Sequence, residues 1–152
     1  MTSSAPFTIS STAFAEGSAI PPEYSCKGAD VSPELVWSGV PDGTKALVLF
    51  VDDPDGRDWV HWSALDLDPR STGLPRGVPA SAAAPQQGRN DFGNVGYGGP
   101  CPPPGTHHYR FTLTALAAPL GLDGHPDGAA VRAALRAATK VATVTLVGTF
   151  RA

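Results

Sequence analysis

The stretch from 46 to 65 reads ALVLFVDDPDGRDWVHWSAL and decides the fold. Its first part, Ala46–Val51, is a short apolar run that stops at acidic residues and Pro54. Such a length, with such flanks, is typical of a buried strand rather than of a helix. The second part, Trp59–Leu65, is rich in aromatic and branched residues and is predicted to form another strand. The Asp-Pro and Asp-Gly pairs between the two runs favour a turn.

Strand signals continue toward the C-terminal end of the chain. Tyr109–Ala115 alternates between apolar and polar residues, which predicts a strand with its odd-numbered residues on one face. Val141–Val147 is rich in β-branched residues and is the last predicted strand. Shorter segments at Phe7–Ile9 and Leu35–Trp37 carry weaker strand signals. Strands therefore account for most of the expected regular structure.

One helix is expected, late in the chain. Asp127 is a suitable N-cap for a helix over Gly128–Lys140, in which Val131, Leu135 and Ala138 recur at helical spacing. Lys140 would close it, where a cation favours the helix end. Residues 69–94 form a long connection of a kind that is usually functional or mobile. The fold class is therefore mainly β: an antiparallel β-sandwich with one late helix, in one domain spanning 1–152.

Composition narrows the classes of function. The net charge is −3, and the 11 Lys and Arg residues never cluster, which excludes a basic nucleic-acid surface and a polybasic membrane anchor. No apolar run is long enough for a membrane span. The first ten residues, MTSSAPFTIS, have neither the basic start nor the apolar core of a signal peptide. We therefore expect a cytoplasmic protein that binds no nucleic acid.

Two segments carry the residues suited to chemistry. In 51–62, VDDPDGRDWVHW, one strand ends in carboxylates and the next presents His61. The period of two puts Trp59, His61 and Ser63 on one face of that strand. Asp52 and Asp55 are interpreted as turn residues only. A histidine between tryptophans is ordinarily a hydrogen-bonded core residue, so His61 needs the second segment to become a ligand candidate.

That second segment, 96–109, reads GYGGPCPPPGTHHY. Its glycines allow close approach to a ligand and its prolines fix the loop shape, before a strand that starts with His107 and Tyr109 on one face. If the segments meet, two imidazoles, a carboxylate, a hydroxyl and loop N–H groups surround one hollow. These groups suit a phosphate-like anion.

A metal site is not expected. The set Asp53, His61 and His107 has suitable ligand types but no recognised zinc spacing, and His107 and His108 point to opposite faces of a strand. His125 lies in a Gly-His-Pro turn, where we expect it to be exposed and without a role. No βαβ unit surrounds the glycine-rich loop, so no dinucleotide cofactor is expected either.

The two cysteines, Cys26 and Cys101, are too few for a disulfide framework or a four-ligand zinc site. They are either two free thiols or a single bridge that ties the turn at 27–30 to the glycine- and proline-rich loop. Cys101 could also act as a nucleophile beside His107, but no third orienting group is evident in the sequence.

Four motifs stand in a fixed order along the chain: Asp53-Pro-Asp55, Trp59-x-His61-Trp62, Gly98-Gly-Pro-x-Pro-Pro-x-Gly105 and His107-x-Tyr109. Together they resemble the signature regions of the phosphatidylethanolamine-binding protein family, also called Raf kinase inhibitor proteins. Ile20-Pro-Pro-x-Tyr24 and Ser32-Pro-x-Leu-x-Trp37 resemble its bacterial branch. The resemblance covers essentially the whole chain. It implies an antiparallel Greek-key β-sandwich with a small anion-binding pocket.

Carried over residue by residue, the resemblance implies a ligand-binding set made of Asp53, Trp59, His61, Gly99, Pro100, Pro103, His107 and Tyr109. Two departures stand out. Gly56 and Arg57 replace a frequent Ala-Pro, which bears on the shape of the rim. His108 replaces the usual arginine of His-Arg-Tyr, which removes a fixed positive charge and bears on anion affinity.

We therefore expect a cofactor-free protein that binds small anions or phosphoryl head groups. The same pocket would allow a regulatory interaction with a protein or lipid partner. The alternative is a cofactor-free isomerase or cyclase that uses the same Asp, His and Tyr residues for acid/base chemistry. Inhibition of a kinase or protease follows only from the family name. A homodimer is expected, because the bacterial branch is often dimeric and the surface carries few charges.

Asp53 is expected to orient an imidazole, which would be that of His61 if the two residues lie side by side. Its charge should raise the pKa of His61 while burial lowers it, and we expect the carboxylate to prevail once an anion is bound.

Overall fold

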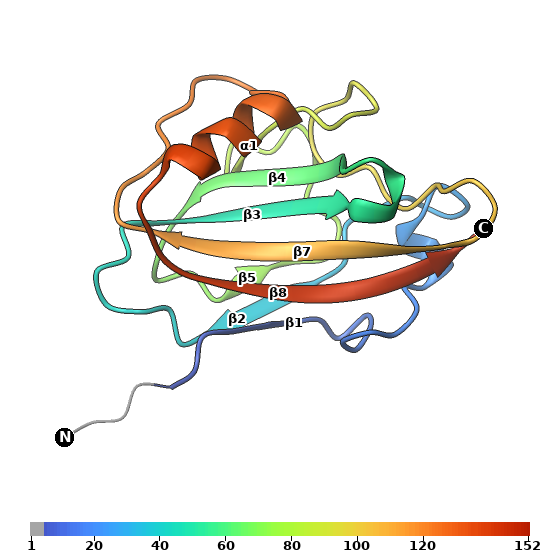
Figure 1. Cartoon of the computed structure of the whole chain (residues 1–152), viewed down its shortest axis with the longest axis horizontal. Helices are drawn as coiled ribbons and strands as arrows, with labels where there is room; N and C mark the ends of the chain where they lie inside the picture. The colour runs from blue at the N-terminus through green and yellow to red at the C-terminus, as the bar shows by residue number, and fades with distance from the viewer. Residues whose placement is uncertain (1–4) are drawn as a thin grey trace.

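The computed structural model describes residues 5–152 and contains two antiparallel sheets and one α-helix in layers (Figure 1). The larger sheet has the order β6-β4-β3-β7-β8 and the smaller one β1-β2-β5. The strands are β1 (Thr8–Ser10), β2 (Leu35–Ser38), β3 (Ala46–Asp53), β4 (Trp59–Leu67), β5 (Gly73–Leu74), β6 (Gln86–Gln87), β7 (Thr106–Leu116) and β8 (Lys140–Arg151). The predicted antiparallel, mainly β fold is confirmed, and this order is compatible with a Greek key. Residues 1–4, which open the stretch compared with a signal peptide, lie outside the described residues.

β3 lies in the middle of the molecule and is buried along its whole length. Leu47, Leu49 and Val51 belong to the main core between the two sheets. Val48 and Phe50 belong to a second cluster, which α1 (Gly128–Ala137) covers from the other side. A strand with both faces covered needs a continuous apolar run, which explains why Ala46–Val51 does not alternate.

A bulge interrupts β4 at His61. Asp52 pairs with Val60, but the next residue of β3, Val51, pairs with Trp62, so His61 is an extra residue on β4. Bulges commonly re-aim a side chain next to a functional site. Because the bulge shifts the alternation, Ser63 lies opposite Phe50, on the α1 side of the sheet. The expectation that Ser63 shares a face with Trp59 and His61 is therefore wrong.

The helix begins where the sequence predicts and ends earlier. The carboxylate of Asp127 accepts a hydrogen bond from the backbone N–H of Ala130 at 2.9 Å, which confirms the N-cap. The helix ends at Ala137 because Ala138 is already extended and Lys140 pairs with Leu116 as the first residue of β8. The prediction that Lys140 closes the helix is wrong. No helix within residues 5–152 is long and apolar enough to cross a membrane.

The long connection at 69–94 is anchored to β4. It contains β5 and β6, and Gln87 accepts a hydrogen bond from the indole of Trp62 at 2.8 Å. The Asp91 carboxylate accepts from the backbone N–H of Val60 at 2.7 Å. These bonds hold the end of the connection beside the start of β4.

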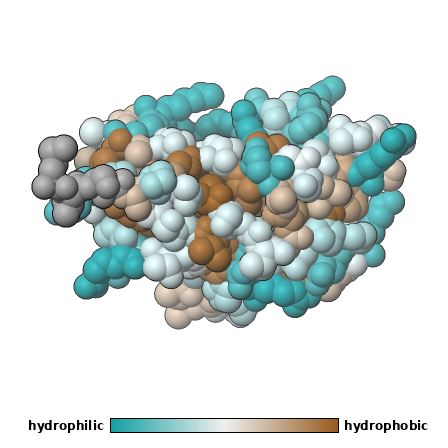
Figure 2. All heavy atoms as spheres, turned by 90° about the horizontal axis from the view of Figure 1, so that it is seen from below, coloured by the Kyte–Doolittle hydropathy of each residue, from teal (hydrophilic) through white to brown (hydrophobic). Residues whose placement is uncertain are grey.

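An apolar hollow of about 590 Å³ lies between β1 and the edge of β8. Figure 2 views the molecule from below, the side on which β1 lies, and shows apolar side chains gathered in the middle of that face. Phe7, Ile9, Phe14 and Leu146 contribute to the lining of the hollow, and Glu16 is its one ionisable residue. It therefore offers little acid/base chemistry.

Candidate functional site

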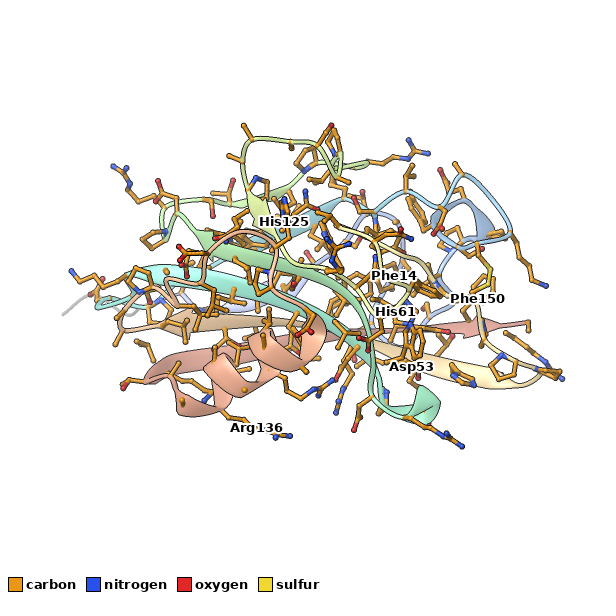
Figure 3. The ribbon with its side chains drawn as sticks, turned by 90° about the horizontal axis from the view of Figure 1, so that it is seen from above. Phe14, Asp53, His61, His125, Arg136 and Phe150 are labelled. Atoms are coloured by element: carbon orange, nitrogen blue, oxygen red, sulfur yellow. A yellow bond between two sulfur atoms is a disulfide. The ribbon has the colours of Figure 1, made fainter. Side chains whose placement is uncertain are left out.

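A small cavity of about 230 Å³ lies where β3 ends, β4 begins and β7 begins. It is lined by Asp53, Gly56, Trp59, His61, Phe92, Cys101, Pro102, Pro103, His107 and Tyr109. Figure 3 shows Asp53 and His61 at this end of the molecule, with His125 and Arg136 well away from them. The two segments that the sequence singles out, 51–62 and 96–109, therefore meet in one hollow.

The carboxylate of Asp53 is saturated by neighbouring donors. One oxygen, Oδ1, accepts from the backbone N–H groups of Asp55 and Gly56 at 2.9 and 3.0 Å, which caps the short 3-10 helix Pro54–Gly56. The other, Oδ2, bonds to Nδ1 of His107 at 2.5 Å. A Cβ at Gly56 would lie 2.6 Å from Oδ2. Glycine at this position therefore leaves room for the Asp53–His107 contact.

This contact sets the orientation of His107. Because a carboxylate oxygen only accepts, Nδ1 of His107 carries the proton and donates it. The other ring nitrogen, Nε2, makes no hydrogen bond to any residue between 5 and 152, and the ring lines the cavity. Of the two imidazoles, Asp53 therefore orients that of His107 rather than that of His61.

His61 is held by the loop at Gly98. Its Nδ1 donates to the carbonyl of Gly98 at 2.6 Å, and the N–H of Gly98 donates to the carbonyl of His61 at 2.9 Å. The imidazole packs edge-on against Tyr109 and Phe92, with ring centroids 5.1 and 5.5 Å away. Burial lowers the pKa of His61 despite the Gly98 carbonyl and the Asp53 charge, which act in the opposite direction. His61 is therefore neutral in the unliganded protein at neutral pH.

Tyr109 contributes a buried hydroxyl without a partner. The residue is 1% exposed, and its Oη makes no hydrogen bond within the described chain. Burial raises the pKa of the phenol, and the charges of Asp53 and Asp55 raise it further, so the hydroxyl keeps its proton. A buried donor without a partner is rare in native proteins and calls for an explanation.

The mouth of the cavity is aromatic. Trp59 and Phe92 are 39% and 44% exposed, and their rings meet edge-on at 5.5 Å. Phe92 comes from the long connection at 69–94, where no periodic pattern marks it, so it is not predictable from the sequence. Pro102 and Cys101 were likewise absent from the predicted set, although both lie within the proline-rich motif.

Two residues of the predicted set, Gly99 and Pro100, do not line the cavity. The N–H of Gly99 donates to Asp30 at 2.7 Å, and the carbonyl of Pro100 accepts from the N–H of Cys26 at 3.1 Å. A Cβ at Gly99 would lie 2.1 Å from the carbonyl oxygen of Tyr24. Both residues therefore fix the loop against the segment at 24–30. The other six predicted residues line the cavity, and ligand binding by them stays a prediction.

The two cysteines form a disulfide, with Sγ atoms 2.00 Å apart. This resolves the alternatives left open by the sequence in favour of the bridge. It joins the turn that follows Tyr24 to the loop at 98–105, and its Cys101 half lines the cavity. In this state Cys101 has no free thiol, so it is no nucleophile.

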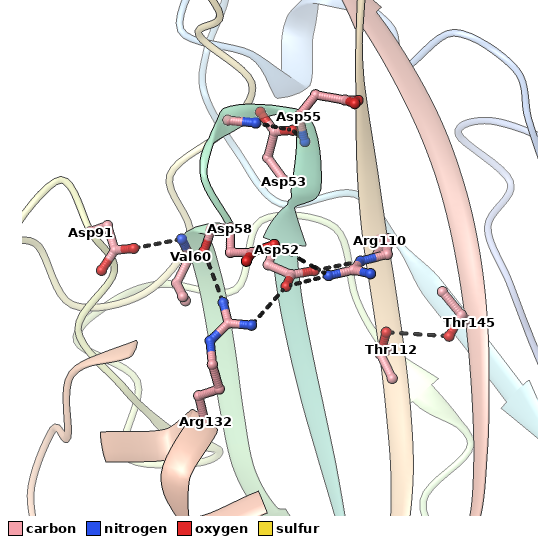
Figure 4. A network of polar contacts seen from close by, with 11 residues as sticks. Asp52, Asp53, Asp55, Asp58, Val60, Asp91, Arg110, Thr112, Arg132 and Thr145 are labelled. Carbon is pink, nitrogen blue, oxygen red and sulfur yellow. Dashed lines mark hydrogen bonds and ion pairs between the residues drawn. The ribbon is translucent and has the colours of Figure 1, made fainter. Parts of the chain in front are cut away.

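Asp52 has a different role from the turn residue that the sequence suggests. It lies in β3, on the face opposite Asp53, and accepts from Nε and one terminal nitrogen of Arg110 at 3.0 and 2.8 Å. Arg132 of α1 adds a third contact at 3.2 Å and also donates to the carbonyl of Asp58 (Figure 4). The pKa of Arg110 is raised by the Asp52 hydrogen bonds. Asp52 therefore joins β3, β7 and α1.

His108 and Asp55 pair on the outside of the molecule. The Asp55 carboxylate contacts both the backbone N–H and Nδ1 of His108 at 2.8 Å, and the side-chain bond is the main cause of its lowered pKa. His108 is exposed while His107 is buried, which confirms that they face opposite ways. The missing arginine at this position therefore concerns Asp55 rather than the cavity. Asp55 is more than a turn residue.

Outside the cavity, His125 is exposed, as expected, but it is not idle. Its Nδ1 donates to the carbonyl of Gln87 at 2.8 Å and so holds the turn at 124–126 against β6. Within residues 5–152 no three His, Cys, Asp or Glu side chains are grouped so that they could hold a metal ion.

The comparisons with known proteins point to one family. A family model described as phosphatidylethanolamine-binding protein matches residues 10–151. A UPF0098 protein of Methanothermobacter thermautotrophicus is 46% identical over 116 residues, which cover 73% of this chain and 77% of the relative. The putative lipoprotein LppC of Mycobacterium tuberculosis is 45% identical over 153 aligned residues, covering 95% and 72%.

Two solved structures share the fold over nearly the full length of both chains. A putative phosphatidylethanolamine-binding protein homologue from Chlamydia trachomatis has a TM-score of 0.86 at 36% identity, with 99% of each chain covered. Escherichia coli YbcL, described as a new member of the mammalian PEBP family, has a TM-score of 0.89 at 35% identity, with 97% and 99% covered. With the family model spanning almost the whole chain, this protein belongs to the phosphatidylethanolamine-binding protein family.

Proposed function

We propose that the cavity binds a small anion, either free phosphate or the phosphoryl head group of a larger molecule. The observation that carries this proposal is the buried Tyr109 hydroxyl, which has no partner within the described chain. The Nε2 atoms of His61 and His107 are also without partners and belong to rings that line the same cavity. A ligand with several oxygens would use all three groups at once.

The charge of Asp53 does not oppose an anion as strongly as its position suggests. Two backbone N–H groups and the imidazole of His107 already occupy its oxygens. If His107 takes up a proton at Nε2, the Asp53–His107 pair becomes neutral overall and presents a charged donor to the ligand. Charge-assisted hydrogen bonds of this kind are about twice as strong as neutral ones.

The size of the cavity limits the ligand. Its volume of about 230 Å³ lies below the roughly 300–1,000 Å³ of sites for drug-sized molecules. A phosphoryl group or a similarly small anion fits this scale, and a larger molecule would leave its remainder at the aromatic mouth formed by Trp59 and Phe92. The proposal is therefore recognition of a head group.

Binding should be linked to proton uptake. His61 is neutral without a ligand because burial lowers its pKa. An anion next to Nε2 would favour the imidazolium, which is the form able to donate there. Affinity should therefore fall as the pH rises through the pKa that His61 has in the bound state.

A phosphate titration followed by NMR tests the proposal. We expect millimolar or lower phosphate to shift the ring signals of His61, His107 and Tyr109. The matched control is His125, an exposed imidazole bonded to a backbone carbonyl away from the cavity, whose signals should not move. His107→Ala should abolish the shifts, and His125→Ala should keep them. Unchanged signals at all three cavity residues would remove the proposal.

A second candidate is a cofactor-free enzyme, an isomerase or cyclase. The observation that favours it is the Asp53–His107 contact of 2.5 Å, because a carboxylate that orients an imidazole prepares Nε2 for general acid/base work. The protonated hydroxyl of Tyr109 could supply the acid. Incubation with a panel of small organic acids and phosphate esters, followed by NMR, would reveal turnover. Conversion that persists in both Asp53→Asn and His107→Ala would remove this candidate.

The homodimer and the compartment remain proposals as well. Light scattering that gives a monomer mass across micromolar concentrations would remove the homodimer. A cytoplasmic location is weakened by two observations: disulfides are rare in cytosolic proteins, and a relative 45% identical to this chain is named a putative lipoprotein. Fractionation of cells after thiol trapping would locate the oxidised protein.

A further inference from the structure

The loop that forms one wall of the cavity is tied unevenly to the rest of the molecule. Its first half is held by hydrogen bonds on several sides. Gly98 exchanges two of them with His61, and the N–H of Gly99 donates to Asp30 at 2.7 Å. The carbonyl of Pro100 accepts from the N–H of Cys26 at 3.1 Å. None of these bonds involves a cysteine sulfur.

The second half of the loop has almost no such bonds. Residues 102–104 are three consecutive prolines, which have no N–H to donate. The carbonyl of Gly105 accepts only a long bond of 3.4 Å from Ala152. Between Pro100 and Gly105, the disulfide from Cys101 is the one tie to another segment of the described chain. This half includes Pro102 and Pro103, which line the cavity.

The other end of the disulfide sits on a tightly folded turn. Ser25 is buried, and its hydroxyl donates to the carbonyl of Pro22 at 2.7 Å and accepts from the N–H of Lys27 at 3.1 Å. Close packing extends to Gly28, where a Cβ would lie 2.5 Å from the carbonyl oxygen of Pro22. Cys26 therefore connects a wall segment with few hydrogen bonds to a turn with several.

Both cysteine residues are exposed, so a reductant can reach the bridge. Exposed disulfides are more often labile or regulatory than buried ones. We propose that the Cys26–Cys101 disulfide is a redox gate of the cavity: the oxidised protein holds the Cys101–Pro103 wall in place for the anion, and reduction by a dithiol releases it. This inference rests on the proposed anion-binding function of the same cavity.

The redox step balances with a dithiol as the reductant. One thiolate of the dithiol attacks a cysteine sulfur, breaks the Cys26–Cys101 bond and forms a mixed disulfide. The second thiol of the reductant then closes its own disulfide. Two electrons and two protons pass to the protein, so both cysteines leave as thiols.

Reduction should weaken binding through loss of preorganisation. The proline run is stiff because each ring fixes φ, so the released segment moves as a unit away from the cavity rather than collapsing locally. Binding would then have to order this wall again, and that cost reduces affinity. We expect the phosphate dissociation constant to rise about fivefold or more on reduction.

The test compares phosphate binding by oxidised, dithiothreitol-reduced and reoxidised wild-type protein with binding by Cys26→Ser. Cys26 does not line the cavity, and this variant keeps Cys101 as the thiol that reduced wild type also has. Oxidised and reoxidised wild type should bind alike. Reduced wild type and Cys26→Ser should bind more weakly by the same factor, and dithiothreitol should not affect the variant. Equal affinity in oxidised and reduced wild type overturns the gate.

A ligand-free readout separates this inference from the proposed function. Backbone order parameters of Cys101 and Gly105 should fall from about 0.85 to below about 0.6 on reduction, while Gly98 and Gly99 keep theirs. If oxidised protein binds no phosphate, the proposed function fails, and these order parameters alone decide the gate. Unchanged values at Cys101 overturn it, and so does global unfolding of reduced wild type, because the bridge would then be a general structural staple. If Cys26→Ser does not fold, the redox cycle of wild type is sufficient.

Discussion

Asp52 and Asp53 are neighbours at the end of β3 and lie on opposite faces of the strand. On the α1 side, Asp52 is enclosed by charged partners: its side chain is 5% exposed and contacts Arg110 and Arg132. On the cavity side, Asp53 is also saturated, but the groups around it are not. The Nε2 atoms of His61 and His107 and the hydroxyl of Tyr109 have no partner within residues 5–152.

The difference separates polar groups that stabilise the fold from polar groups that are kept for a ligand. Both carboxylate oxygens of Asp52 are bonded to arginines, so this network is expected to contribute to stability only. An open one leaves buried polar groups unsatisfied, which costs stability and is retained where a ligand completes the bonds. Substitutions on the two faces should therefore act on different measurements.

The largest effect should come from breaking the closed network. Asp52→Asn removes the charge that two arginines share, and Arg110 and Arg132 are left beside each other. Loss of one partner of a buried ion pair costs about 3–5 kcal/mol, and we expect about 2 kcal/mol because both arginines are partly exposed. Urea unfolding measures this loss. Phosphate affinity should change by less than about twofold.

Asp68→Asn is the matched control for that experiment. Asp68 also pairs with an arginine, Arg70, but both side chains are largely exposed. Its substitution should stay within about 0.5 kcal/mol of wild type. A similar loss of stability in both variants would show that charge alone, rather than the buried network, is responsible.

The second effect, that of Tyr109→Phe, should leave stability unchanged or higher and make phosphate binding weaker. Tyr109→Phe removes a hydroxyl that no described residue uses, so the free energy of unfolding should stay the same or rise by up to about 1 kcal/mol. Phosphate affinity should fall about tenfold, because a hydrogen bond to a charged group is worth about 1.5–3 kcal/mol. Calorimetric titration and urea unfolding of one preparation measure both. A clear loss of stability without a loss of affinity would place Tyr109 with the structural face.

Much of this comparison could be predicted from the sequence. The strands follow from apolar runs and alternation, and the capped start of the helix follows from Asp127. The prediction was wrong about the register of individual residues within β4 and at the start of β8. The bulge at His61 moves Ser63 to the other face, and nothing in a pattern of period two marks an inserted residue. The helical spacing extends the predicted helix to Lys140, and its pairing, as part of β8, with Leu116 of β7 has no signal in the local sequence.

For the site, the residue types were predictable and their partners were not. Six of the expected residues line the cavity: five lie on β3, β4 and β7, which converge there, and Pro103 lies on the loop before β7. The choice of His107 rather than His61 as partner of Asp53 depends on side-chain positions across β3 and β7. Phe92 reaches the cavity from a long connection, and the bonds of Asp91 to Val60 and of the Phe92 N–H to Asn90 hold it there. Such tertiary placement leaves no local signature.

The third effect concerns pH and sharpens the role of His61. Burial lowers its pKa below the ordinary 6.5, so the unfolded chain binds the proton more readily than the folded one. Stability from this group is present above about 6.5 and is lost as the pH falls toward the folded-state value. The loss is at most about 1.4 kcal/mol per pH unit. Urea unfolding measured at a series of pH values below about 6.5 should show a shallower pH dependence of stability for His61→Gln than for wild type.

Sulfate binding tests the same residue from the ligand side, because the charge of sulfate does not change in this range. Affinity in wild type should fall as the pH rises, since loss of the proton removes a charged donor. His61→Gln should flatten that profile. A flat wild-type profile would mean that neither imidazole contributes its charge.

The smallest effect should come from restoring the arginine that the family usually has next to His107. His108→Arg adds a fixed positive charge directly before Tyr109 in the chain, and the sequence alone suggests stronger anion binding. The side chain at 108, however, is exposed, lies outside the cavity and pairs with Asp55. Because an exposed pair is worth about 0.2–1 kcal/mol and salt screens it, stability should change by less than about 0.5 kcal/mol. Phosphate affinity at physiological ionic strength should stay within about twofold of wild type. A clear gain in affinity that survives added salt would show that position 108 reaches the ligand, and would move it from the outer face of β7 to the cavity side of the comparison.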